Sequence, residues 1–151
     1  EDLTARGVSF LMLDFDNTIV PYTTSKPTAQ MAAWIRTMQA SEIRLCIVSN
    51  SKKPRVVEFC KTYGLDCITH AKKPFSRGIR ACLTRYALDP AACALVGDQI
   101  FTDRLAAGLY DIPCLYTMPR GGDHQRGVQF KRRFEPYWLD RYYQKGGRLY
   151  E

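Results

Sequence analysis

The sequence predicts an α/β protein whose mostly parallel sheet of about five strands carries helices on both faces. Short apolar runs typical of buried strands alternate along the chain with longer segments in which apolar residues recur at helical spacing. This alternation implies right-handed crossovers between parallel strands, and no repeat or low-complexity linker interrupts it. In addition, acidic and polar residues follow several apolar runs directly, as expected at the ligand-binding edge of such a sheet.

The first elements follow from apolar patterning. Residues 8–13 form an apolar run and are predicted to be a strand. Residues 27–40 place apolar side chains at helical spacing, and Pro27 suits the first turn of a helix. Residues 43–48 are again strand-like, and residues 54–63 repeat the helical pattern.

The second half of the chain continues the alternation. Residues 67–69 are predicted to be a short strand, and residues 75–87 a helix with one apolar face. Residues 93–96 are strand-like, residues 102–107 helical, and residues 113–117 strand-like. A chain of 151 residues is large enough to bury a real core.

Composition limits the class of protein. Apolar residues make up 46% and charged residues 25% of the chain, as in ordinary globular domains. No apolar run approaches the roughly 18 residues that a membrane-spanning helix needs. The six cysteines form no CxxC pair or Cys/His cluster, which indicates reduced core thiols and a reducing, cytoplasmic compartment. No targeting segment is visible in the chain.

Polar residues follow three of the predicted strands. Asp14 and Asp16 follow the first strand, Ser49 and Asn50 follow the second, and Asp98 follows the fourth. Asp14 and Asp16 are two positions apart, so in extended chain their side chains can face one pocket. A shared hard cation such as Mg²⁺ would remove the repulsion between them. Each aspartate alone could simply cap the next helix, but together they favour a binding site.

Four short motifs resemble those of a known family. DFDNT, VSN, AKKP and VGDQIFTD occur in this order between residues 14 and 103. They resemble the four motifs of the haloacid dehalogenase (HAD) superfamily of phosphohydrolases, and most closely those of its YqeG-like branch in subfamily IIIA. The resemblance covers roughly residues 3–118. It implies a Rossmann-like HAD core, phosphatase activity and Mg²⁺ as cofactor.

The resemblance also implies roles for individual residues. Asp14 would be the nucleophile that forms an aspartyl-phosphate, and Asp16 would serve as general acid and then as general base. Mg²⁺ would be held by the carboxylates of Asp14 and Asp98 and by the main-chain carbonyl of Asp16. Lys73 would balance the charge of the transferring phosphoryl group and steady Asp14.

Further residues would support this machinery. Ser49 and Asn50, together with Lys73, would bind phosphate oxygens. Asp103 would support either the metal site or Lys73 from behind. Thr18 would bond back to Asp14 or act as a cap in the turn.

The spacing of the motifs leaves no room for a cap domain. Only 32 residues separate Asp16 from Ser49, and only 22 separate Asn50 from Lys73. Predicted helices and strands already fill both gaps. An open site suits a phosphate that is displayed on something large, such as a lipid surface, a protein or a nucleic acid.

The end of the chain has a different composition. Residues 119–151 are predicted to be a basic, aromatic-rich extension packed on or beside a capless HAD core of residues 1–118. The extension holds eight basic and four acidic side chains, which contribute +4 to the net charge of +7. A helix is expected from about Glu135 to Gly146. Either its aromatics dock on the core with its charges in water, or the surface contacts anionic lipid, and the two are compatible. The aromatic and basic residues concerned are Phe130, Lys131, Arg132, Arg133, Phe134, Trp138, Arg141, Tyr142 and Lys145.

The leading hypothesis is a Mg²⁺-dependent phosphomonoesterase. The resemblance suggests phosphatidylglycerophosphate as one substrate, because some YqeG-like relatives dephosphorylate it. This reading makes the protein cytoplasmic or peripheral on an anionic membrane. A phosphoprotein or nucleic-acid phosphatase is the next choice, and nucleic acid is the less favoured partner. The sequence does not indicate an oligomeric state.

Two non-enzymatic classes are alternatives to this hypothesis. A phospho-accepting receiver domain is disfavoured, because its phosphorylated Asp ends the third strand, where this chain has Thr69 and His70. A binding protein of HAD fold that contacts RNA or the ribosome is compatible with the charge of +7. However, the motif set is intact, so the sequence gives no sign that catalysis has been lost.

Overall fold

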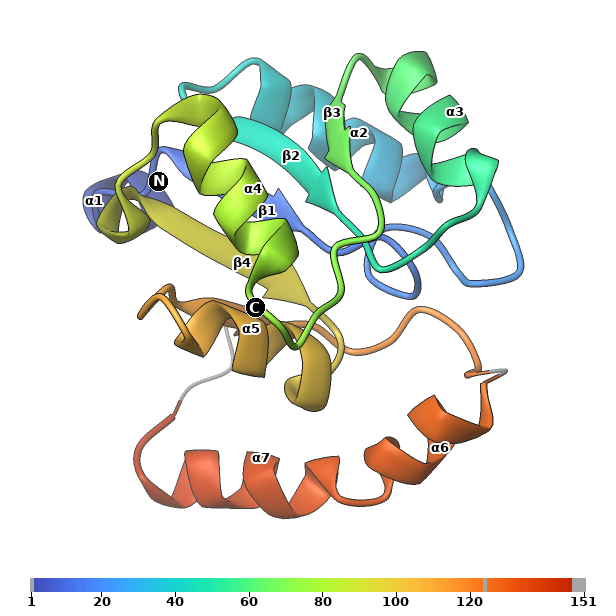
Figure 1. Cartoon of the computed structure of the whole chain (residues 1–151), viewed down its shortest axis with the longest axis vertical. Helices are drawn as coiled ribbons and strands as arrows, with labels where there is room; N and C mark the ends of the chain where they lie inside the picture. The colour runs from blue at the N-terminus through green and yellow to red at the C-terminus, as the bar shows by residue number, and fades with distance from the viewer. Residues whose placement is uncertain (1, 124, 148–151) are drawn as a thin grey trace.

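The computed structural model describes residues 2–123 and 125–147 (Figure 1). At its centre lies a five-stranded sheet in the order β3-β2-β1-β4-β5, in which every neighbouring pair is parallel. The prediction of a mostly parallel α/β sheet is therefore confirmed. The strands are β1 (Phe10–Leu13), β2 (Arg44–Val48), β3 (Asp66–Ile68), β4 (Cys93–Gly97) and β5 (Cys114–Tyr116).

Helices cover both faces of this sheet (Figure 1). The helices α2 (Ala29–Gln39) and α3 (Pro54–Tyr63) pack on one face, and α4 (Arg77–Tyr86) and α5 (Leu105–Gly108) pack on the other. The remaining helical elements are α1 (Asp2–Ala5), a 3₁₀ turn (Pro90–Ala92), a π-helical turn (Ile100–Arg104), α6 (Arg126–Arg132) and α7 (Glu135–Gln144).

The central strand β1 is buried along its whole length. Because successive side chains of a strand point to opposite faces, Leu11 and Leu13 pack toward α2 and α3, whereas Phe10 and Met12 pack toward α4 and α5. Each of these side chains is at most 1% exposed, and burying one such side chain stabilises a fold by about 1.5–3 kcal/mol. The two-sided burial explains why the first apolar run does not alternate with polar residues.

Two helices differ from the sequence-based prediction. Thr28 is the N-cap of α2 and accepts a hydrogen bond from the Met31 N–H at 3.2 Å, so Pro27 lies before the helix rather than in its first turn. The predicted helix 102–107 is divided between the π-helical turn and α5. In that turn the Gln99 carbonyl accepts from the amides of three successive residues, 102 to 104.

The described residues that follow β5 contain one predicted helix and one that was not predicted. α7 begins at Glu135 as expected, whereas α6 precedes it without a recognisable apolar stripe in the sequence. The alternative in which the aromatics dock this segment on the core is disfavoured, because they are 49% to 61% exposed. Instead, Arg132 and Glu135 turn inward and contact the loop after β4. The exposed aromatics are Phe130, Phe134, Trp138 and Tyr142.

The described residues contain no cap domain, since α2 and β2 fill the first gap between the motifs and α3 and β3 fill the second. None of the helices in the described part of the chain has the length and apolar character needed to cross a bilayer. All six cysteines are free thiols, four of them buried.

Candidate active site

The site lies at the carboxyl edge of the sheet, where the chain leaves the two central strands β1 and β4. The register pairs Leu13 with Val96, and the Asp14 N–H donates to the Val96 carbonyl at 2.9 Å. This pairing brings Asp14, which follows β1, next to Asp98, which follows β4. The strand order reverses here, because β2 lies on one side of β1 and β4 on the other. Such a switch point is where open α/β sheets bind their ligands.

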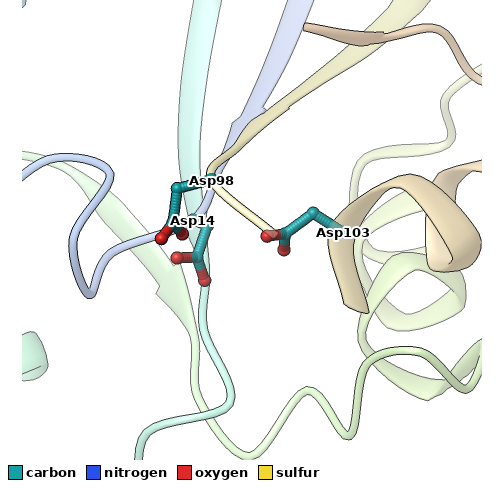
Figure 2. Close-up of side chains that lie close together, drawn as sticks. All are labelled: Asp14, Asp98 and Asp103. Atoms are coloured by element: carbon teal, nitrogen blue, oxygen red, sulfur yellow. The ribbon is translucent and has the colours of Figure 1, made fainter. Parts of the chain in front are cut away.

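A third carboxylate, Asp103, reaches the same place from the π-helical turn (Figure 2). One oxygen atom of each of Asp14, Asp98 and Asp103 lies within 4.8 Å of the other two, and all three residues are buried. Gly97 makes this approach possible, since a Cβ atom at that position would overlap the Asp103 carboxyl group. The glycine of the VGDQIFTD motif therefore has a steric role.

Lys73 neutralises part of this charge. Its Nζ donates to Asp14 Oδ1 and to Asp103 Oδ1, each at 2.6 Å, and the residue is only 5% exposed. Burial by itself would lower the pKa of the Lys73 ammonium, but the charges of Asp103 and Asp14 raise that pKa above its ordinary value. Lys73 is therefore held as a buried cation.

Asn50 fixes the loop that carries Lys73. Its Oδ1 accepts from the Lys73 N–H at 2.7 Å, and its Nδ2 donates to the Lys73 carbonyl at 2.9 Å. This pair of bonds ties the loop after β2 to the loop after β3. The structure thus gives the Asn50 side chain a positioning contact that the motif pattern did not indicate.

Thr18 lies between two of the carboxylates. Its hydroxyl is 3.2 Å from Asp14 Oδ2 and 3.1 Å from Asp98 Oδ1. A hydroxyl has one proton, so it can donate to only one of these oxygens at a time. The predicted bond from Thr18 back to Asp14 is present, and the facing oxygens of Asp14 and Asp98 share a single donor.

The electrostatics of the cluster favour a bound cation. Burial, followed by the charge of Asp14, raises the pKa of Asp98 to about 7, although Arg132 opposes the rise. Burial also raises the pKa of Asp103 to about 6, against the opposing charge of Lys73. The three buried carboxylates outnumber their two cationic partners, Lys73 and Arg132, and the facing oxygens of Asp14 and Asp98 have one donor between them. An all-oxygen cluster with an excess of carboxylates fits a hard divalent ion such as Mg²⁺.

Two further predicted site residues lie around this cluster. Asp16 forms a salt bridge with Arg55 from α3, and its side chain is 20% exposed. The hydroxyl oxygen of Ser49 accepts from the Ser51 N–H at 3.0 Å, and Ser49 is buried. Arg55 was not identified from the sequence, because nothing in a surface-type arginine two residues inside a helix indicates a partner 39 positions away.

Arg132 is the largest departure from expectation. The sequence predicted that Arg132 faces water or lipid with the other basic side chains of the C-terminal tail (residues 119–151). This prediction is wrong. Its guanidinium binds the carboxylate and the main-chain carbonyl of Asp98, and its side chain is only 15% exposed. Asp123 and Glu135 bind the same guanidinium, each at 2.8 Å. Sequence reasoning identified neither of these acids, because both are ordinary charged residues in a charge-rich segment.

Comparison with known proteins agrees with this geometry. The model of the haloacid dehalogenase-like hydrolases matches residues 1–108. "Probable phosphatase YqeG" of Bacillus subtilis (strain 168) is 27% identical over 146 residues, covering 97% of this chain and 85% of that protein. An uncharacterized protein from Listeria monocytogenes serotype 4b has a similar fold, with a TM-score of 0.62 and 12% identity over 79% of this chain and 84% of that one. A proposed HAD superfamily (subfamily III A) hydrolase from Legionella pneumophila superposes with a TM-score of 0.54 and 15% identity, over 64% and 59% of the two chains.

Replacing Lys73 by Met should destabilise the metal-free protein by about 3–5 kcal/mol, because Asp14 and Asp103 would stay buried without their common cation. Urea unfolding in excess chelator measures the change. The neighbouring Lys72→Met is the matched control, since Lys72 is exposed. A Lys73→Met/Asp103→Asn double variant should recover part of the loss. If Lys73→Met unfolds within about 0.5 kcal/mol of the wild type, the ion pairs do not stabilise the fold.

Proposed function

The chain belongs to the haloacid dehalogenase-like hydrolases and is a phosphatase, and we propose that it hydrolyses phosphomonoesters with Mg²⁺ through a covalent intermediate on Asp14. The observation that carries this proposal is the buried cluster at the switch point of the sheet. There Asp14, Asp98 and Asp103 converge from separate loops and Lys73 binds two of them. A purely structural cluster would not need an excess of carboxylates over cations.

The residues suited to Mg²⁺ are Asp14 and Asp98, with the main-chain carbonyl of Asp16 as a third ligand. Asp103 Oδ1 accepts a hydrogen bond from Lys73 Nζ at 2.6 Å, and Asp103 would support the metal site indirectly by holding Lys73 in place. Bound Mg²⁺ would supply the positive charge that lets two carboxylates and a phosphate share one pocket.

In the first step a carboxylate oxygen of Asp14 attacks the phosphorus in line with the ester oxygen. The bond from phosphorus to oxygen of Asp14 forms as the bond to the leaving alcohol breaks, which gives an aspartyl-phosphate. Lys73 holds Asp14 Oδ1 at 2.6 Å, so the carboxylate is oriented before the substrate arrives. The ammonium also offsets charge on the transferring phosphoryl group.

Asp16 would donate a proton to the leaving oxygen and then accept one from the water that cleaves the aspartyl-phosphate. That second step releases inorganic phosphate and regenerates Asp14. The Arg55 guanidinium already occupies one carboxylate oxygen of Asp16. Action of Asp16 on the leaving oxygen therefore requires that substrate binding loosen this ion pair.

Phosphate oxygens would be bound by Ser49, Asn50 and Lys73. The Ser49 hydroxyl oxygen accepts one bond, so its proton is available to donate. The Asn50 amide has two N–H groups, and only one of them is used by the Lys73 carbonyl. Asn50 thus holds Lys73 close to the Ser49 hydroxyl and the Asn50 amide, the other donors that would bind the phosphate oxygens.

An open site favours a phosphate on a large carrier, and we propose an anionic lipid surface as that carrier. Phosphatidylglycerophosphate is the candidate substrate, because the motifs resemble those of the YqeG-like branch, some members of which dephosphorylate it. The tail supports this choice, because α6 and α7 present exposed aromatic rings among exposed basic residues. Aromatic rings and basic side chains are the groups that favour the interface of an anionic membrane. Such a protein would work in a reducing compartment, in keeping with six free thiols.

Hydrolysis of an aryl phosphate should require Mg²⁺ and should be abolished by Asp14→Asn. The amide is close in shape to the carboxylate but is a poor nucleophile, so the fold should survive. A colorimetric phosphatase assay measures the rate, and circular dichroism checks the fold. Asp140→Asn on the exposed face of α7 is the control and should keep full activity. Undiminished wild-type activity in excess chelator would exclude the proposed role of the metal.

Asp16→Asn should slow the hydrolysis of alkyl phosphates more than that of aryl phosphates. General acid help is worth about 10²–10⁴-fold and matters most when the leaving oxygen is basic. The measurement is kcat/KM across a series of phosphate esters with leaving groups of different pKa. Equal losses across the series would mean that Asp16 has no role as an acid.

Neutralising Lys131, Arg133 and Arg141 to Gln should weaken binding to anionic vesicles without changing the rate on a small soluble phosphate. Each basic residue near an anionic leaflet contributes about 1 kcal/mol, so three change partitioning by about a hundredfold. Arg132 is left intact because it is bound to Asp98.

The matched control for this lipid test removes three exposed charges from core helices, namely Arg36, Lys61 and Arg80. Co-sedimentation with vesicles of phosphatidylglycerol and phosphatidylcholine measures both variants, and added salt should mimic the tail substitutions. If the tail variant and the core variant sediment alike, the tail is not the lipid-binding surface.

A further inference from the structure

Arg132 is the last residue of α6, and its side chain reaches the edge of the sheet where the active-site carboxylates meet. Its Nη2 binds Asp98 Oδ2, and its Nη1 binds the main-chain carbonyl of Asp98. Asp98 is completely buried, and the side chain of Arg132 is 15% exposed. The contact spans 34 positions of sequence, and it joins the tail of the chain to the loop after β4.

The guanidinium is itself held in place. Asp123 Oδ2 accepts from its Nε and Glu135 Oε2 accepts from its Nη1, each at 2.8 Å. Asp123 is in turn bonded to Asn17 at 3.0 Å, and buried Glu135 accepts from the Ile100 N–H at 2.9 Å. A surface arginine would sample many rotamers, whereas this one is fixed by three acids.

The two carboxylate oxygens of Asp98 have different partners. Oδ2 is bound by Arg132, whereas Oδ1 lies 3.1 Å from the Thr18 hydroxyl, on the side of Asp14. Binding of one oxygen and of the adjacent carbonyl by a planar fork prevents rotation of the carboxyl group. Asp98 therefore presents one defined oxygen to the place where a cation would lie.

We infer that Arg132 is a positioning residue for the metal site, which orients the carboxylate of Asp98 and makes the C-terminal segment part of the active site. The inference rests on the proposed function, since it concerns the cation that the phosphatase would use. Outer contacts of this kind typically change metal affinity or activity about 10–100-fold when they are removed.

The alternative is that Arg132 occupies the place of the cation and competes with it. Among the described contacts Arg132 has none with Asp14 or Asp103, the other members of the cluster. A competing guanidinium would be expected to bridge the carboxylates, as Lys73 does for Asp14 and Asp103. The two possibilities predict opposite changes in metal affinity.

The test measures binding of Mn²⁺ to the full-length, metal-free protein by electron paramagnetic resonance, with no substrate present. Arg132→Gln should weaken binding about 10–100-fold. Arg132→Lys keeps the charge but loses the fork, so its affinity should lie between those of Gln and wild type. Arg126→Gln removes the same charge from an exposed position on the same helix and should leave affinity unchanged.

Phosphatase activity gives a second measurement. It distinguishes a loss of metal positioning from a general loss of folded, active protein. The Mg²⁺ concentration for half-maximal rate should rise in Arg132→Gln, while the rate at saturating Mg²⁺ falls less. If Arg132→Gln does not fold, Glu135→Gln takes its place, because it loosens Arg132 without touching Asp98. That variant should shift Mn²⁺ affinity in the same direction by a smaller factor.

The outcomes distinguish the inference from the proposed function. If the wild type binds no Mn²⁺ and has no phosphatase activity, the proposed function fails. If the wild type binds Mn²⁺ and hydrolyses phosphate esters but Arg132→Gln matches it in affinity, only the inference fails. Tighter binding by Arg132→Gln would also overturn the inference and would establish competition instead.

Discussion

The structure depends on burying more negative than positive charge at one edge of a parallel sheet. Asp14, Asp98 and Asp103 lie within 4.8 Å of one another, with Lys73 as the cation between two of them. Buried ions of one sign repel strongly at these distances, so the arrangement persists only if its partners are fixed by the surrounding fold. The fold supplies that rigidity through strands that are buried on both faces.

Each loop at this edge contributes a different constraint. Gly97 lets Asp103 approach β4, and Asn50 bonds both main-chain groups of Lys73. Thr18 stands between Asp14 and Asp98 with one proton for two oxygens. Loops that follow β1, β2, β3 and β4 thus meet at a single point, although they are far apart in the sequence. The cluster is a property of the topology, because the order β3-β2-β1-β4-β5 places β1 between β2 and β4.

The strands and most of the helices could be predicted because the information for them is local. An apolar run such as Phe10–Leu13 indicates a buried strand, and the position of Asp14 and Asp98 after such runs places them at the same edge. The π-helical turn and the inward direction of Arg132 could not be predicted. Both depend on partners that the fold brings together, such as the Gln99 carbonyl and the Asp98 carboxylate. The roles of the site residues stay predictions, whereas their proximity is a feature of the structure.

The number of basic residues in the tail does not show which of their side chains face water and which face the core. Lys131, Arg132 and Arg133 are adjacent and identical in charge, yet the first and third face water and the second binds Asp98. Successive residues of a helix point about 100° apart, so a run of three basic residues at the end of α6 can serve two purposes at once. The outward pair leaves a basic surface among exposed rings, while the inward guanidinium offsets charge beside the sheet. Movement of α6 would therefore change the surroundings of Asp98, which gives contacts made by the tail a physical route to the chemistry of the site.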